Sequence, residues 1–338
     1  MDSKKLECNL QHISSILKNR TFILFLLSQG FSGFGDAFRF IAVTSLLVKV
    51  TGSGLSAGLG LVFSIVPCIV LSLFAGFTGD ILNVRYLLIS IELARSIIGL
   101  LFINYSNLYY IYILIILISS LDAFYNPPLR KALIALSGKK DVLKGNSLLS
   151  GTLAVTSILG SSAAGIIIST WGIESAFLAN CYFHSIAVIF LLLLKISSNR
   201  LMCDNINIFE TKYEFRHRTN YNHRYKSNYS HRYSPEYSPR YKSKYDINSN
   251  SGYSIKTVGI REAWYYIKET IPSKKAIIAN IVVGFGVVSV NMAFYPFAFD
   301  NLRVGEKGWG FMMSIFYGSN LIAMGIALWL NKKLRSMQ

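Results

Sequence analysis

The chain has 338 residues, of which 52% are hydrophobic and only 15% charged, yet its formal net charge is +17. Average soluble domains carry about 25% charged residues, so the composition excludes an ordinary water-soluble domain. A chain that is both apolar and basic must concentrate its charge in a few segments, as multi-spanning membrane proteins do in their cytoplasmic loops.

Eight apolar runs are each long enough for a membrane-spanning helix, which needs about 20 mostly apolar residues. They cover residues 22–48, 56–79, 86–103, 108–125, 148–169, 175–195, 276–299 and 309–331. The strands of a membrane β-barrel would be about 10 residues long with alternating polarity, unlike these runs. The sequence therefore predicts an all-α polytopic membrane protein.

Lysine and arginine residues gather on one side of this predicted topology. Basic segments are the N-terminal tail 1–21, the loop after the fourth run, residues 196–275, and the C-terminal tail 332–338. The loops 51–56, 104–107 and 170–174 contain no lysine or arginine. Because basic loops stay in the cytoplasm, both termini are expected on the cytoplasmic side of the membrane. The membrane is expected to be the plasma membrane of a prokaryote. The N-terminal residues lack the apolar core of a signal peptide.

The segment 196–275 divides a six-helix part, residues 22–195, from two further spans within residues 276–331. Its fifteen lysine and arginine residues outnumber seven acidic ones, and a tyrosine recurs at every fourth position over 221–248. Pro235 and Pro239 oppose a helix there, and the near absence of aliphatic residues predicts a disordered insert. Attachment to anionic lipid is the sharper alternative, and no nucleic-acid partner is expected. Residues 257–271 predict an amphipathic helix on the inner leaflet.

Charged residues inside the predicted spans are the strongest functional candidates, since a charge in the bilayer interior costs at least a few kcal/mol. Asp36 and Arg39 lie three residues apart in the first span, and Glu92 and Arg95 repeat this spacing in the third. Asp122 lies close to the cytoplasmic end of the fourth predicted span. Each pair either holds helices together or binds a transported proton, because burial favours a neutral acid while a neighbouring base favours the charged form. The arginines could instead orient an anionic substrate.

Two further features of the spans are weaker candidates. His184 is the only histidine within a predicted span, where it is either an ordinary hydrogen-bonded interior histidine or part of a proton relay. The four cysteines Cys8, Cys68, Cys181 and Cys203 form no CxxC pair, so neither a disulfide framework nor a metal site is expected.

Several stretches together resemble one branch of a known transporter family. Residues 76–85, GFTGDILNVR, resemble the loop signature of the major facilitator superfamily at Gly76, Asp80 and Arg85, while Ile81 and Asn83 depart from it. Residues 35–80, 124–136 and 259–268 resemble the first two helices, the exit of the fourth helix and the approach to the seventh in macrolide-efflux and enterobactin-exporter proteins.

The resemblance implies specific roles for these residues. Asp80 and Arg85 would belong to a charge network that latches the cytoplasmic side in one state; otherwise they are ordinary solvated loop charges. In the fifth helix, Gly151, Gly160 and Gly165 loosely match the glycine-rich antiporter signature, with Ser161 where a proline is usual. We expect these glycines to form a close-packing face first and a gating element second.

The resemblance also implies a fold and a function. The major facilitator fold would be present as a complete six-helix N-terminal half plus two helices of the C-terminal half, so the chain is expected to be truncated after its eighth helix. The expected function is proton-coupled efflux of small lipophilic compounds by a non-enzymatic secondary transporter. No nucleotide-binding motif occurs, and the expected energy source is a proton gradient without a cofactor. Expected partners are membrane lipids, the substrate and a second chain supplying missing helices. The alternative is a non-transporting remnant or a scaffold whose basic loop recruits partners.

Overall fold

A computed structural model describes residues 19–105, 107–138, 141–194, 278–279, 282, 286, 289–290 and 292–337, without the side chains of 73, 76–81, 320 and 323–337. Predictions for the tyrosine repeat (221–248), the amphipathic helix (257–271), the whole basic segment 196–275 and most of the seventh span lie outside these residues. The described part of the chain consists of helices and their connections, which confirms the all-α prediction.

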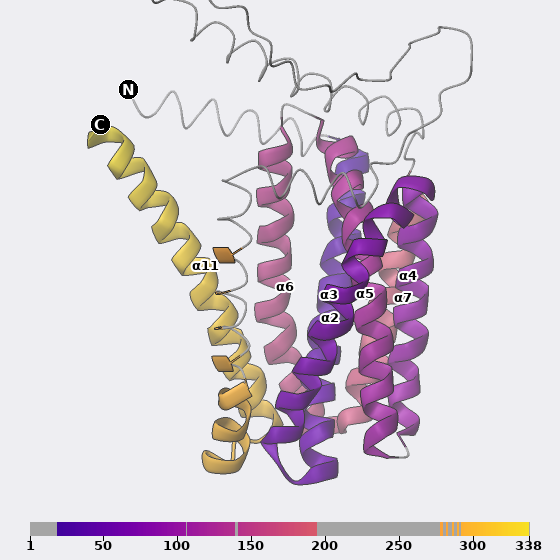
Figure 1. The fold of residues 1–338 in the computed structure, drawn as a ribbon, viewed down its shortest axis with the longest axis vertical. Helices are drawn as coiled ribbons and strands as arrows, with labels where there is room; N and C mark the ends of the chain where they lie inside the picture. The colour runs from indigo at the N-terminus through magenta and orange to yellow at the C-terminus, as the bar shows by residue number, and fades with distance from the viewer. Residues whose placement is uncertain are drawn as a thin grey trace, which may run out of the picture.

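Within the described residues, six helices are long and apolar enough to cross a membrane, and neighbours in the chain run in opposite directions (Figure 1). The elements are α2 (Arg20–Thr51), α3 (Gly54–Ile81), α4 (Val84–Leu101), the short helix η1 (Phe102–Asn104), α5 (Leu108–Ser137), α6 (Val142–Trp171), α7 (Ile173–Leu193), the π-helix η2 (Phe297–Asn301) and α11 (Glu306–Met337). The predicted eighth span, 309–331, lies within α11, which is not one of these six helices.

Several helices begin or end at residue types that commonly cap helices. Gly52 ends α2 in a left-handed conformation with φ +69°, and its N–H donates to the carbonyl of Val48 at 2.7 Å. This conformation suits glycine because it has no Cβ. Asn83 caps α4 by accepting the N–H of Arg85 at 3.1 Å, and Asn107 caps α5 in the same way from Tyr110 at 2.8 Å. Asparagine is among the best N-cap residues, which accounts for Asn83 where the family signature has glycine.

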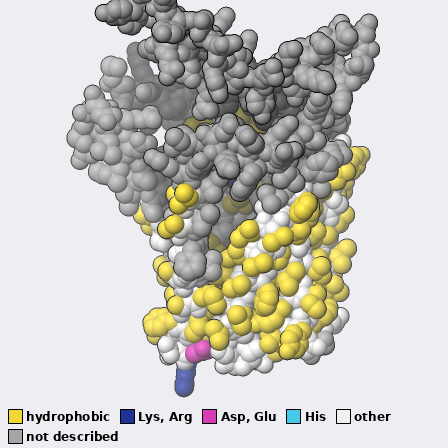
Figure 2. Space-filling view, in the orientation of Figure 1, with side chains coloured by type: hydrophobic (Ala, Val, Ile, Leu, Met, Phe, Trp, Pro, Cys, Tyr) yellow, Lys and Arg dark blue, Asp and Glu magenta, His cyan; other side chains and the backbone are white. Residues whose placement is uncertain are grey.

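The helix α2 lies centrally and packs against both α6 and α7, while α3 packs on α5, and α4 packs on α5 and α7. The outward side chains are apolar, as Figure 2 shows over the lower part of one face. Ile69, Ile97 and Ile189, on three different helices, are all more than half exposed. An apolar exterior around a helical bundle suits a hydrocarbon environment, where backbone groups must be satisfied within each helix.

The last helix, α11, contacts α6 near the end of the bundle that holds the α2–α3 turn, and diverges from α6 toward the opposite end (Figure 1). Gly165 and Gly310 bring the two backbones together, since a Cβ built on Gly165 would lie 3.0 Å from the Cα of Gly310. The hydroxyls of Ser162 and Ser314 are 2.6 Å apart at the same interface. Small residues of this kind let membrane helices approach closely.

The predicted packing glycines differ in their surroundings. A Cβ on Gly160 would lie 2.7 Å from the Cβ of Ala37, so Gly160 sits at a close contact with α2, as Gly165 does with α11. Among the described residues, a Cβ on Gly151 would meet no atom within 4 Å. A close-packing role for Gly151 therefore stays a prediction.

We predict opposite effects for two alanine substitutions in α6. Gly165→Ala places a methyl group 2.7 Å from the backbone oxygen of Glu306, which cannot rotate away, and we expect a loss of about 1–3 kcal/mol from overpacking. Gly151→Ala adds a methyl group that meets no described atom within 4 Å and raises helix propensity by up to about 1 kcal/mol. Equilibrium unfolding in mixed detergent micelles measures both, and equal effects would contradict the glycine contact.

Candidate functional site

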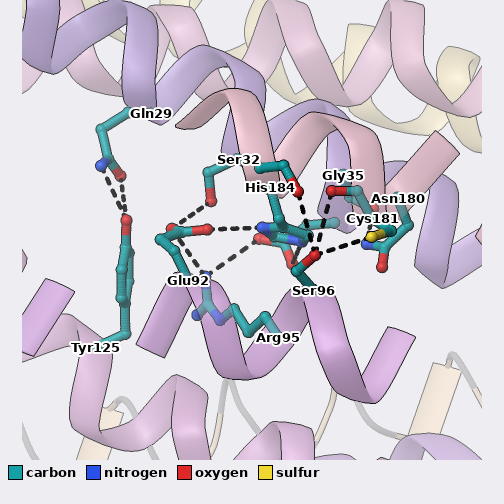
Figure 3. Close-up of polar contacts among 12 residues, drawn as sticks. Gln29, Ser32, Gly35, Glu92, Arg95, Ser96, Tyr125, Asn180, Cys181 and His184 are labelled. Carbon is teal, nitrogen blue, oxygen red and sulfur yellow. Dashed lines mark hydrogen bonds and ion pairs between the residues drawn. The ribbon is translucent and has the colours of Figure 1, made fainter. Parts of the chain in front are cut away.

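Four helices present polar side chains to a common interior. The spacing within each helix is three or four residues, which keeps the side chains on one face. The members are Gln29, Ser32, Asp36 and Arg39 on α2, Glu92 and Arg95 on α4, Asp122 and Tyr125 on α5, and Asn180 and His184 on α7. We call these ten residues the polar layer. Figure 3 shows most of it, with Glu92 lying between Ser32 and His184.

Two clusters of buried apolar residues flank the polar layer along the helices. On α2 the first cluster supplies Phe22 and Phe25 before the layer, and the second begins at Phe38. On α7 the order is reversed, since Phe177 of the second cluster precedes the layer and Leu191 of the first cluster follows it. The charges are therefore enclosed between two apolar zones, where water cannot freely replace missing partners.

Two arginines and two aspartates form a closed group of ion pairs. Arg39 contacts Asp36 at 2.6 Å within α2, and Arg95 contacts Asp122 at 2.5 Å between α4 and α5. Longer contacts of 3.8 Å join Arg39 to Asp122 and Arg95 to Asp36. Each arginine thus interacts with both aspartates, and the group ties three helices together.

The pair Glu92–Arg95 is less close than its spacing in the sequence suggests. Arg95 Nη1 lies 3.6 Å from Glu92 Oε1, whereas its contact with Asp122 on the next helix is the short one. The guanidinium of Arg95 also lies over the ring of Tyr125, 4.1 Å from its centroid, a geometry that stabilises a cation on an aromatic face. The hydroxyl of Tyr125 is held by the amide of Gln29 at 2.9 and 3.1 Å.

Glu92 is fully buried and is held by Ser32 and His184. The Ser32 hydroxyl donates to Oε1 at 2.8 Å, and the Nδ1 of His184 lies 2.6 Å from Oε2. His184 is also fully buried, and its contact with Glu92 is compatible with both of its sequence-based interpretations, an interior histidine and part of a proton relay. Its Nε2 has no hydrogen-bond partner and lies 3.8 Å from Asp36.

The polar layer contains one more acid than strong bases. Asp36, Glu92 and Asp122 face two arginines, which leaves a charge of −1 when His184 is neutral. An uncompensated charge in a dry interior is costly, and binding one proton removes it. The side chains of Asp36 and Asp122 are 39% and 32% exposed, whereas Glu92 is 0% exposed. Asp36 and Asp122 are therefore the partly accessible carboxylates of the layer, and Glu92 is the enclosed one.

Asp122 lies in the middle of α5, whereas the sequence placed it near the end of the fourth predicted span. The predicted fourth span stopped at residue 125, but α5 continues through Pro127 and Pro128 to Ser137. Asp122 consequently lies at the level of Arg95, and the expectation of a position near the cytoplasmic end is wrong. Proline removes one backbone hydrogen bond but is tolerated in membrane helices when neighbours compensate.

The residues of the loop signature lie apart from the polar layer. Gly76 and Asp80 occur near the end of α3, where side chains are not described. Arg85, in the first turn of α4, donates from Nε to the carbonyl of Leu191 at 3.3 Å and from Nη2 to the carbonyl of Leu192. Arg85 thus satisfies carbonyls at the end of α7, where such groups lack helical partners. Its proposed latch with Asp80 stays a prediction.

The contacts that connect the charged pairs of different helices were not predicted from the sequence. Each pair was expected within one helix, while the structure also joins Asp36, Glu92 and Asp122 through Arg95 and brings His184 to Glu92. The available signal was the spacing of polar residues on α2, which recurs as Gln29, Ser32, Asp36 and Arg39. Among the described residues, no group of three His, Cys, Asp or Glu side chains is placed to hold a metal ion.

A bundle of membrane-length helices around a buried ionisable layer is the arrangement of a polytopic helical membrane protein. Residues 25–337 match the sequence model of the Major Facilitator Superfamily. The match covers most of the chain, which therefore belongs to this superfamily of transporters. A search of the curated proteins finds no match.

We predict that Arg95 contributes most to the stability of the polar layer. Arg95→Ala leaves three carboxylates facing one arginine, and removing one partner of a buried pair costs about 3–5 kcal/mol. The exposed Arg130, which contacts Asn146 at 2.6 Å, is the matched control, and Arg130→Ala should lower stability far less.

A double variant separates lost packing from unpaired charge. Adding Asp122→Asn to Arg95→Ala removes one orphaned carboxylate and should restore part of the stability, measured as the free energy of unfolding in mixed micelles. If Arg95→Ala and Arg130→Ala were equally stable, or if the double variant restored nothing, the ion-pair account of Arg95 would be wrong.

Proposed function

We propose that this chain is a proton-coupled secondary transporter that exports small lipophilic compounds. The observation that carries the proposal is the surplus acid of the polar layer, enclosed between two apolar zones. Ionisable groups at such a position in a membrane protein are costly and usually belong to substrate or proton pathways. Superfamily membership supports transport, and the surplus acid supports the proton.

The proton and the ion pairs compete for the same carboxylates. When Asp36 is ionised it accepts from Arg39 at 2.6 Å and lies 3.8 Å from Arg95, so it links α2 to α4. Protonation of Asp36 makes this carboxyl neutral and weakens both contacts. The two arginines then interact mainly with Asp122 and Glu92. Proton binding therefore changes which helices are held together, which is the link that coupled transport requires.

The lipophilic substrate class and the outward direction rest on the resemblance of residues 35–80 and 124–136 to macrolide-efflux and enterobactin-exporter proteins. The aromatic character of the contact between α2 and α7 is compatible with this class. Phe34 and Phe38 on α2 both lie against Phe183 on α7, with ring centroids 5.5 and 5.3 Å apart. The alternative, a non-transporting protein whose basic loop recruits partners, predicts no proton-driven flux at all.

We predict that Asp36→Asn abolishes proton-driven export while substrate affinity stays within about tenfold. Asparagine keeps the size and polarity of the side chain but cannot bind or release a proton. The measurement is loss of a lipophilic fluorescent dye from vesicles that contain the purified chain, with and without an imposed proton gradient.

Asp141→Asn is the matched control. Asp141 also contacts a base, Lys144, at 2.7 Å, but it lies outside the polar layer, at the N-cap of α6. Export in this variant should respond to the gradient as in the wild type. Unchanged proton-driven export in Asp36→Asn would reduce Asp36 to a structural partner of Arg39, and absence of dye export by the wild-type chain would favour the non-transporting alternative.

A further inference from the structure

We propose that His184 holds the coupled proton and that Asp36 passes the proton to it. This inference rests on the proposed function and names the group that carries the proton within the same layer. The geometry that carries it is a fully buried imidazole between two carboxylates. Its Nδ1 lies 2.6 Å from Glu92 Oε2, and its Nε2 lies 3.8 Å from Asp36 Oδ1.

The hydrogen bonds around Glu92 determine which ring nitrogen is free. Glu92 accepts from the Ser32 hydroxyl at 2.8 Å on one oxygen, and the ionised carboxylate can only accept on the other. The Nδ1 of His184 therefore donates to Glu92 in the neutral ring. This leaves Nε2 as a buried acceptor without a hydrogen-bond partner, facing Asp36. Buried polar atoms without partners are rare, and this one is a vacant position for a proton.

More acidic than basic side chains surround the ring, and this excess of negative charge favours its protonated form. The surrounding groups are Asp36 and Arg39 from α2, Glu92 and Arg95 from α4, and Asp122 with the neutral Tyr125 from α5. The only ionisable residue of α6 is Lys144, which pairs with Asp141 at 2.7 Å. With the ring neutral the layer carries −1, and one proton on Nε2 brings it to zero. No further ion is needed to balance the buried charge.

Two neighbours keep the imidazole in this position. Gly35 on α2 lies against the ring, because a Cβ built on it would be 2.8 Å from both Cδ2 and Nε2. Asn180, one turn before His184 on α7, donates to the carbonyl of Gly35 at 2.8 Å, and Figure 3 shows Asn180 and His184 beside Gly35. The missing side chain of Gly35 and the Asn180 contact together set the distance between the ring and the carboxylates.

The proposed transfer is a single proton movement. Asp36 is 39% exposed and takes up the proton, whereas His184 is 0% exposed. The O–H bond of the protonated Asp36 then breaks as an N–H bond forms at Nε2, so the carboxylate regains its charge and its contact with Arg39. At 3.8 Å the two atoms are beyond hydrogen-bond distance, and the transfer proceeds after rotation of the carboxyl group or through one bridging water.

The decisive experiment observes the protonation of His184 directly. The full chain is labelled with ¹⁵N-histidine in lipid nanodiscs, and its five histidines are followed from about pH 5 to about pH 9, a range that brackets the ordinary histidine value of about 6.5. The signal absent from His184→Asn belongs to His184. We expect it to change from one to two ring protons as the pH falls, with a midpoint that shifts to lower pH in Asp36→Asn because a carboxylate that favours the charged ring is gone.

A second experiment measures transport in substituted chains and separates loss of the proton site from an effect of substitution elsewhere. In His184→Asn the amide can still donate to Glu92 but cannot bind a proton, so proton-driven export should fall at least tenfold while dye exchange without a gradient persists. Asp141→Asn, the control from outside the polar layer, removes an ionisable group at the N-cap of α6, so export and its pH profile should stay as in the wild type.

The outcomes distinguish this inference from the proposed function. A His184 that stays neutral over the whole pH range, or a His184→Asn chain with unchanged proton-driven export, would overturn the inference even where Asp36 proves essential. A His184 that titrates and responds to Asp36→Asn in a chain without proton-driven export would support the proton site and defeat the proposed function. The titration of the wild-type chain decides the matter where a variant fails to fold.

Discussion

The structure depends on the requirement that charges in an apolar interior find partners. Arg95 provides a partner for all three acids of the polar layer, since it contacts Asp36, Glu92 and Asp122, and it also lies against Tyr125. These residues come from three helices, so the same contacts that neutralise the charges also determine how α2, α4 and α5 are placed. Buried ion pairs contribute little net stability compared with apolar residues of similar size. Their value here lies in specifying one arrangement and in leaving one negative charge that a proton can remove.

The apolar clusters on either side give the polar layer its chemical properties. Phe22 and Phe25 lie on one side of it along α2, and Phe38 and Ile41 on the other, all nearly without exposure. Excluding water strengthens the electrostatic contacts of the most buried members, Glu92, Arg95 and His184. The same exclusion makes an unpaired atom such as His184 Nε2 expensive. The proton proposed at this position would therefore alter the free energy of the bundle more than a proton at an exposed carboxylate.

Much of the architecture follows from sequence patterns, because the patterns reflect local requirements. Apolar runs of membrane length indicated the six helices, Gly52 marks the end of α2 by its backbone freedom, and charged residues inside the spans pointed to Asp36, Arg39, Glu92 and Arg95. The links between helices could not be obtained in this way. Whether Arg95 pairs with Glu92 on its own helix or with Asp122 on another depends on the rotation of α4 relative to α5, which no local pattern contains. The continuation of α5 through Pro127 and Pro128 was missed for a similar reason, since neighbouring helices decide whether a proline ends a membrane helix.

The helix α2 connects the polar layer to the contact with α11. Thr44, eight residues beyond Asp36 on α2, accepts the indole N–H of Trp309 at 2.9 Å, and Trp309 is fully buried among Phe294, Tyr295 and Phe299. Near the same end of the bundle, Asp300 accepts the N–H of Gly54 at 2.7 Å at the start of α3, where a carboxylate is favoured by the helix dipole. Residues two turns apart on one continuous helix move together when the helix moves as a rigid body. Asp36 and Thr44 lie on one helix, so a rigid-body movement of α2 would affect both the ion pair with Arg39 and the contact with Trp309 of α11.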